Sequence, residues 1–286
     1  MTETAMILRN GNRSARVLKV VVGQDEIRFG RSVCIGLERT LRVPDDGRTY
    51  SLPPGLDTFP LYAVKDYADR VPATWRKDDG VFVPVYQHEA VWISFSGRWW
   101  KPNAVKIGLN GVNAVSGKPW TDTLSAKPQD YIIVPDQPYL HGFRAARNGV
   151  HQFVAPPLAG GAMDGGKLPT QEGHTIEVVV FEPKAGRFPS QEPQDRVRPN
   201  TSDQWLSGCG NGSGPAGNGK RLKIAKDEHG IDTWSPSDCG RAFLYLVNSR
   251  VFREITGKSP PPSPITAEHY STYGVPWCDR YNEHGH

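Results

Sequence analysis

The sequence predicts a mainly β protein, either an antiparallel β-sandwich or a jelly-roll-like fold, with a few short helices that are mostly C-terminal. Short runs rich in β-branched and aromatic residues recur along the chain, and glycine and proline separate them. Glycine (30) and proline (25) are both well above average usage in these 286 residues, as many short strands require. The chain has no succession of long helices of period 3.6 that would cover a parallel sheet.

Hairpins are expected near the N-terminus. Met6–Leu8 and Val17–Val22 flank an Asn-Gly pair, which is the strongest short hairpin signal. Thr40–Val43 and Thr49–Leu52 face each other across Pro44–Gly47, which predicts a second hairpin. The other elements expected in this part are strands at Ile27–Phe29 and Phe59–Val64 and one helical turn within Lys65–Asp69.

The centre of the chain alternates apolar runs with turn residues, which favours consecutive antiparallel strands. In the third run Lys106 separates apolar residues, so one face points inward and one outward. Trp92 lies opposite the aliphatic face of the second run, and we favour a second covered face over an exposed contact. The four runs are Val81–Tyr86, Ala90–Phe95, Ala104–Leu109 and Tyr131–Val134.

Strands and two short helices are expected after the centre. Ser249–Thr256 forms a helix that ends at Gly257, and Thr266–Tyr273 forms one that Thr266 caps and Gly274 stops. The strands expected here are Val150–Ala155, His174–Phe181, Arg221–Lys226 and Ala242–Val247. We divide the chain into a β-rich core (1–182), a long Gly/Pro-rich loop or linker (183–219) and C-terminal strands and short helices packed on the core (220–286).

Charge and apolar pattern limit the partners and the location. The 34 basic and 30 acidic residues are interspersed and leave a net charge of only +4, so nucleic acid is not an expected partner. The first residues lack a basic region followed by an apolar one, and no apolar stretch approaches the length of a membrane span. These patterns predict a soluble cytoplasmic protein, with non-classical export or a removed leader left open.

No pattern predicts a metal site or a cofactor. The four cysteines, Cys34, Cys209, Cys239 and Cys278, form no Cys-x-x-Cys pair, and buried free thiols are favoured over disulfides. The histidines show no His-Glu-x-x-His spacing. The glycine run that ends at Lys220 has the spacing of a phosphate-binding loop, but Arg221 stands where that loop needs Ser or Thr.

Two groups of residues are candidates for function. The pair His88-Glu89 and the pair Asp136 with His141 suit general acid and base work if they converge, although hydrogen-bonded surface roles are favoured. Aromatic residues in or beside loops suit a stacking platform for a sugar or a hot spot for a protein partner, while the alternative is that they fill the ends of the core. These aromatic residues are Trp99, Trp100, Trp120 and Tyr139, and the C-terminal tail adds Trp277 and Tyr281.

Several segments resemble a group of uncharacterised bacterial proteins. They are Val112–Gly117, Asp130–Gly142, Gln152–Ala155, Gly240–Gly257 and Tyr273–Trp277. The resemblance implies a shared fold from about residue 81 onward and a C-terminal part integral to it, and it transfers no catalytic residue.

The leading hypothesis is a non-catalytic β-rich protein that binds a partner or assembles with copies of itself through the aromatic loops and tail. A homo-oligomer or a protein partner is expected, and a carbohydrate is the other partner class considered. The alternative is a hydrolase or carbohydrate-active enzyme with Glu89, Asp136 and His141 around one cleft.

Overall fold

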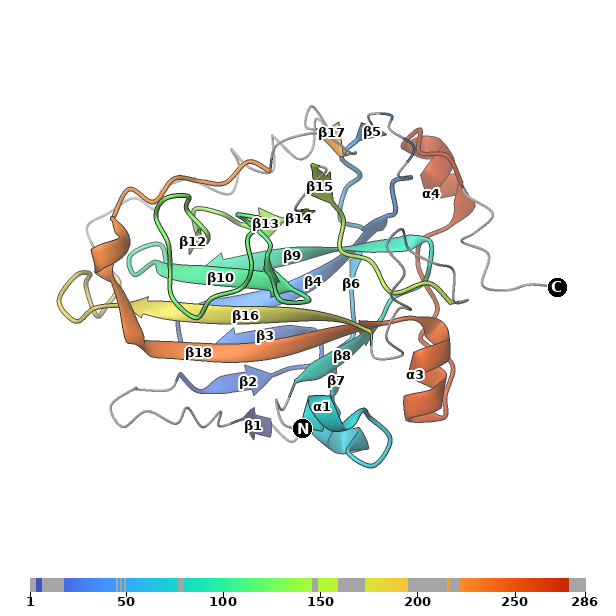
Figure 1. Ribbon diagram of the computed structural model, residues 1–286, viewed down its shortest axis with the longest axis horizontal. Coiled ribbons are helices and arrows are strands. Elements are labelled where there is room, and N and C mark those ends of the chain that lie inside the picture. Colours follow the sequence, from blue (N-terminus) through green and yellow to red (C-terminus); the bar gives the residue numbers. More distant parts are fainter. Residues whose placement is uncertain are drawn as a thin grey trace.

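Two seven-stranded sheets lie one over the other in the computed structural model, which describes residues 4–6, 18–44, 46, 48, 50–76, 80–145, 149–158, 173–194, 215–216 and 222–277 (Figure 1). Strands of nine residues or more run through the centre of each sheet. The chain is therefore mainly β, as the sequence predicts, with sandwich-like packing and few short helices.

The first sheet is antiparallel throughout. Its order is β1 (Thr4–Met6), β2 (Val20–Val22), β3 (Glu26–Phe29), β4 (Val33–Leu41), β9 (Glu89–Gly97) and β13 (Tyr139–Leu140), with β6 (Asp57–Thr58) also on β4. β1 and β2 pair as the expected N-terminal hairpin requires, and its turn at residues 10–11 lies outside the described residues.

The second sheet is mixed, because β18 and β8 are parallel. Its order is β11 (Val112–Asn113), β10 (Asn103–Leu109), β16 (His174–Pro183), β18 (Trp234–Val247), β8 (Val81–Pro84) and β7 (Tyr62–Ala63), with β12 (Ile132–Val134) also on β10. The C-terminal strand β18 lies between β16 and β8 and so completes this sheet.

Short elements surround the sheets. Two small pairs join β14 (Phe143–Arg144) to β15 (Val150–His151) and β17 (Pro215–Ala216) to β5 (Tyr50–Ser51). The helices are η1 (Val64–Tyr67), α1 (Ala73–Arg76), η2 (Ile231–Thr233), α3 (Ser249–Thr256) and α4 (Ala267–Thr272). None of the helices in the described ranges is long and apolar enough to cross a membrane.

Both C-terminal helices begin and end where capping residues predict. The Asn248 side chain accepts a hydrogen bond from the Val251 backbone N–H at 3.0 Å at the start of α3. Gly257 ends that helix with φ 71°, a left-handed conformation that glycine adopts readily. Thr266 is the N-cap of α4.

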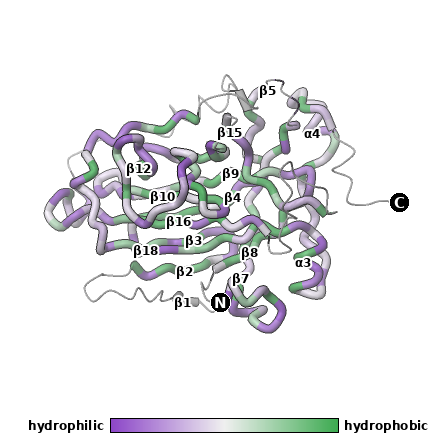
Figure 2. Tube along the Cα trace, viewed as in Figure 1, coloured by the Kyte–Doolittle hydropathy of each residue, from purple (hydrophilic) through white to green (hydrophobic). Residues whose placement is uncertain are grey.

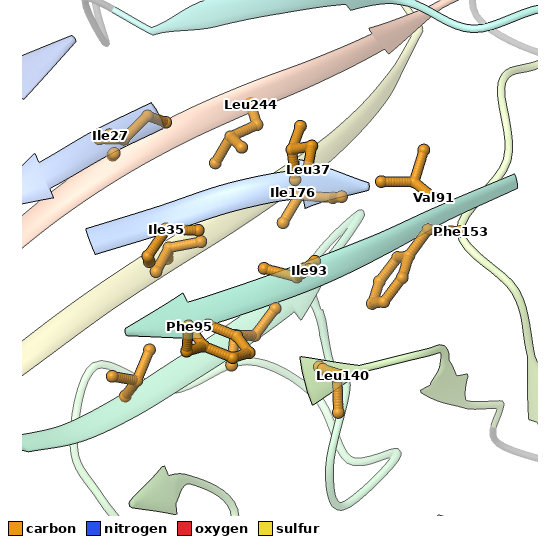
Figure 3. Packing of buried hydrophobic residues seen from close by; sticks show 14 of the residues in the cluster. Ile27, Ile35, Leu37, Val91, Ile93, Phe95, Leu140, Phe153, Ile176 and Leu244 are labelled. Atoms are coloured by element: carbon orange, nitrogen blue, oxygen red, sulfur yellow. The ribbon is translucent and has the colours of Figure 1, made fainter. Parts of the chain in front are cut away.

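One apolar core fills the space between the sheets. Along β4 and β9 every second side chain points into it, including Ile35, Leu37 and Ile93 (Figure 3). Leu244 from β18 and Ile176 from β16 meet them from the second sheet. Hydrophobic segments accordingly lie along the central strands, and hydrophilic segments lie mostly in the connecting loops (Figure 2).

The second sheet is also covered on its outer face. At one end η1, α1 and α3 cover β8 and β18, where Trp75 stacks on Tyr245 at 4.1 Å between ring centroids. At the other end Tyr131 and Trp234 pack against outward residues of β10 and β16. All seven residues of β10 are therefore buried.

Lys106 shows the consequence of this cover. It lies on the outward face of β10, as its place in the alternation predicts, yet its side chain is 0% exposed. Its Nζ donates to Asp130 Oδ2 at 2.7 Å, to Thr121 Oγ1 at 3.0 Å and to the Thr123 carbonyl. The lysine therefore holds the loop that covers it, because a buried ammonium needs such partners.

Two predictions of strand pairing are wrong. Thr40–Val43 does not form a hairpin with Thr49–Leu52, because β4 pairs with β3, β6 and β9 while β5 pairs with β17. The four central strands do not all lie in one sheet, since β9 is in the first sheet and β8 and β10 are in the second, whereas β10 and β12 are antiparallel neighbours as expected. The strand partners depend on the burial of both sheet faces and on pairing between distant segments. Turn residues indicate only where the chain reverses, so they predict neither.

Some predicted strands are shorter or absent. The run Phe59–Val64 contains only β7 before η1 begins, and Val150–Ala155 contains only β15 and an isolated bridge from Phe153 to Val91. Residues 222–226 form no strand. The side-chain amides of Gln129 and Gln137 form hydrogen bonds with the backbone of this segment, in place of the hydrogen bonds that a neighbouring strand would form.

We expect Gln137→Leu to release this segment. Gln137 Oε1 accepts from the Ala225 N–H at 2.9 Å, and leaving that donor unpaired costs about 1–3 kcal/mol. Denaturant unfolding should show this loss, and hydrogen exchange at Ala225 should become faster. The exposed Gln24→Leu is the matched control and should change neither quantity. Unchanged exchange at Ala225 would contradict the role given to the amide.

Candidate functional site

The outer face of the first sheet carries small and polar side chains at its centre. Because Ile35 and Leu37 point into the core, their neighbour Gly36 lies on the outer face. The strand register pairs Gly36 with Ser94 of β9 on one side and with Glu26 of β3 on the other. The alternation that directs apolar side chains into the core therefore also places small and polar side chains on the outer face, and we call this outer surface around Gly36 the polar floor.

A hollow of about 480 Å³ opens over this floor. Its volume lies within the range of small-molecule sites, which is roughly 300–1,000 Å³. Three strands of the first sheet, the loop before β3, the end of β6 and the start of β13 contribute residues. The lining residues are Asp25, Glu26, Cys34, Gly36, Glu38, Thr58, Ser94, Phe95, Ser96 and Tyr139.

Gly36 leaves the floor of this pocket open. A Cβ at this position would lie 2.7 Å from Ser94 Oγ and 3.7 Å from Glu38 Oε1. The first distance is shorter than real Cβ contacts, so any side chain here would displace the serine. The glycine therefore keeps the hydroxyl and the carboxyl accessible from the pocket.

Glu38 is the half-buried carboxyl of the pocket. Burial raises its pKa above the ordinary value of 4.5, and the nearby charges of Asp57 and Asp25 act in the same direction. The Ser94 hydroxyl opposes this by donating a hydrogen bond to Glu38 Oε1 at 2.9 Å. The net result favours the protonated form of Glu38 more than in a solvated glutamate.

Glu26 has different surroundings at the rim. Arg28 forms an ion pair with it, and the Arg28 Nε–H donates to Glu26 Oε1 at 2.6 Å. The second guanidinium bond goes to the same oxygen. Nearby, burial and then the charge of Glu26 raise the pKa of the Cys34 thiol, so this cysteine stays a thiol at neutral pH.

Aromatic residues form the side of the pocket next to β13. Tyr139 lines the pocket, and its ring centroid lies 6.0 Å from that of Trp92. Trp92 is 3% exposed, so the preference for a covered position is confirmed. Within the described chain its Nε1 is buried without a hydrogen-bond partner.

Glu89 lies outside the pocket, and its carboxylate has several bonded partners. Its carboxylate is 0% exposed and pairs with Arg39 at 2.5 Å, while the Tyr86 N–H and the Ser263 hydroxyl donate further hydrogen bonds. Burial raises its pKa, and the charge of Arg39 opposes that rise. The residue thus ties β9 to β4 and to the C-terminal segment.

Asp136 and His141 are in separate surroundings. Burial raises the pKa of Asp136, whose charged neighbours are His229 and Asp227, and burial lowers the pKa of His141. The structure describes Glu89, Asp136 and His141, and no hydrogen bond joins any two of them. None of the three lines the pocket.

Most of the predicted aromatic residues make internal contacts. Trp99 and Trp100 pack edge to face, and Trp99 donates to Glu192 at 3.2 Å. Trp120 lies over the Lys106 ammonium, at 5.2 Å, and against Gly108. Trp277 contacts His88 and Tyr270 yet stays 36% exposed. Tyr281 lies outside the described residues. Among the predicted aromatic residues that the structure describes, Tyr139 alone lines the pocket.

Sequence reasoning missed the carboxylates of this site. The available signal was the alternation of Ser94 and Ser96 with apolar neighbours in β9, together with Gly36 and Glu38 at every second position of β4. Cys34 and Cys239 are free. Among the described residues no group of three or more His, Cys, Asp or Glu side chains is placed to hold a metal ion.

Comparison with known proteins found no matching protein-family model, no similar curated protein and no similar solved structure. The resemblance to uncharacterised bacterial proteins therefore stays an expectation.

We expect Glu89→Ala to destabilise the fold strongly. Removing one partner of a buried ion pair leaves the Arg39 charge unpaired, which costs about 3–5 kcal/mol. Denaturant unfolding measures the loss. The exposed Glu228→Ala serves as the control and should change stability by less than about 0.5 kcal/mol. Equal stabilities of the two variants would show that the pair does not hold these strands.

Proposed function

We propose that the protein binds a small carbohydrate in the pocket on the outer face of the first sheet. The observation that carries this is the lining, in which carboxylates and hydroxyls surround the open floor at Gly36 beside the ring of Tyr139. Carboxylates and serine hydroxyls accept hydrogen bonds from sugar hydroxyls, and an aromatic ring covers the apolar face of a sugar ring. The volume of the pocket suits one or two sugar units.

The lining supports this ligand class over others. An anionic ligand would meet three carboxyl groups, those of Asp25, Glu26 and Glu38, and the nearby Arg28 is already paired with Glu26. A purely apolar ligand would leave the Ser94 and Ser96 hydroxyls facing it without water. A neutral ligand with many hydroxyl groups satisfies these atoms without either cost.

Binding can be tested with an array of mono- and oligosaccharides followed by calorimetry. We expect Tyr139→Ala to weaken binding by about 2- to 10-fold, as the loss of roughly 0.5–1.5 kcal/mol from ring contact implies. Gly36→Val should abolish binding, because its side chain fills the floor. Trp99→Ala, outside the pocket, should leave affinity unchanged. If no sugar binds the folded protein at millimolar concentration, this function is wrong.

Self-association is a second candidate, supported by exposed aromatic residues near the C-terminus. Among the described large apolar residues Tyr273 is 41% and Trp277 is 36% exposed, and tyrosine and tryptophan are enriched in contacts between proteins. We propose that copies of the chain meet through this region.

Light scattering after size exclusion tests this contact. The mass should rise with protein concentration, and the double variant Tyr273→Ser, Trp277→Ser should keep the monomer mass. A monomer at every concentration in the original chain would exclude the contact. Trp99→Ser, an aromatic substitution elsewhere, is the control.

A further inference from the structure

Two carboxyl side chains lie on opposite sides of the open floor of the pocket. Glu26 lies directly across from Gly36, and Glu38 is two residues further along the same face of β4. Such diagonal neighbours on antiparallel strands are roughly 7–8 Å apart. A ligand above Gly36 therefore has one carboxyl group on each side.

The two carboxyl groups differ in the way that acid and base groups of a catalytic pair differ. Glu38 is half-buried and faces the carboxylates of Asp57 and Asp25, which favours its protonated form. Glu26 is at the rim in an ion pair with Arg28, and both guanidinium hydrogen bonds go to its Oε1. Where an enzyme site holds two carboxyl groups, the one whose pKa is raised by its surroundings acts as the acid and leaves the role of base to the other.

The partners of the two carboxyl groups lie on different strands. Ser94 lies on β9 and binds the Glu38 carboxyl, whereas Glu26 lies on β3, on the other side of β4. The hydrogen bond to Ser94 directs the Glu38 carboxyl toward β9, and the contact with Arg28 directs the Glu26 carboxyl along β3, so the two carboxyl groups are held apart. Wide separation of the carboxyl groups is characteristic of glycosidases in which a base activates water directly.

We propose that the protein hydrolyses the glycosidic bond of the carbohydrate that it binds, with Glu38 as the proton donor and Glu26 as the base. This rests on the proposed carbohydrate binding. It also relocates the acid–base pair, because the hydrolase alternative from the sequence placed it at Glu89, Asp136 and His141.

The reaction balances with water as the only co-reactant. Glu38 gives its proton to the glycosidic oxygen while the bond between that oxygen and the anomeric carbon breaks. Glu26 takes a proton from a water molecule, whose oxygen bonds to the anomeric carbon from the opposite side. Solvent water then carries the proton from Glu26 back to Glu38, so one glycoside and one water give a free sugar and an alcohol.

Leaving-group dependence tests the role of Glu38. The substrates are the alkyl glycoside and the 2,4-dinitrophenyl glycoside of the sugar that binds best. We expect Glu38→Gln to lower kcat for the alkyl glycoside by about 10²–10⁴-fold, the usual contribution of a general acid. The loss should be much smaller for the dinitrophenyl glycoside, which leaves without protonation. Equal losses for both substrates would overturn the acid role, since a structural defect affects both alike.

The role of Glu26 and the protonation of Glu38 have separate readouts. Glu26→Ala should lose activity, and added azide should restore it with formation of a glycosyl azide. The sugar product should have the inverted anomeric configuration by NMR, and retention would overturn the assignment of Glu26 as base.

Asp57→Asn removes one charge that faces Glu38, so the alkaline limb of the pH profile should move to lower pH. An unmoved limb would show that Glu38 is not the acid.

The outcomes separate the two proposals. If a sugar binds by calorimetry and none of its glycosides is cleaved, the hydrolase inference is wrong and the binding function stands. If no sugar binds, both fall. Glu228→Gln, an exposed glutamate outside the pocket, should retain full activity, which controls for charge removal alone.

Discussion

Alternation of side chains along the β4–β9 ladder is the constraint on which the rest of the structure depends. The same two strands direct Leu37 and Ile93 into the core and Gly36, Glu38 and Ser94 to the outer face. A shift of the register by one residue would exchange these two sets, burying a carboxyl group and exposing the aliphatic side chains. Formation of the core and formation of the pocket therefore have a single cause.

The two outer faces of the sandwich differ because their side chains differ. On the second sheet the outward residues Phe82 and Tyr245 are large and aromatic, so helices and loops must cover them. On the first sheet Gly36, Glu38 and Ser94 are small or polar groups that water can solvate, and Trp92 next to them on β9 is covered. A pocket can stay open there without loss of apolar burial, and this explains why it lies on the first sheet.

Buried charges in this protein serve two different ends. Glu89 and Lys106 are 0% exposed, and each is surrounded by bonded partners from distant segments, so they join parts of the chain. Glu38 is only half-buried and has one bonded partner, Ser94, among the described residues. Because Glu38 has fewer hydrogen-bond partners, its carboxyl can bind a ligand. The charged groups of Glu89 and Lys106 already bind several partners and cannot do so without losing them.

The sequence by itself determined the local elements and the class of the fold. Runs of β-branched residues marked most strands, and Gly257 and Thr266 marked the end of α3 and the start of α4, because propensity and capping act over a few residues. Only the tertiary structure decided which strands are neighbours and which polar groups meet. Ser94 is 56 residues from Glu38 in the chain, and the register of three strands brings both together with Glu26. Pairing of that kind depends on burial of whole faces, which no short stretch of sequence encodes.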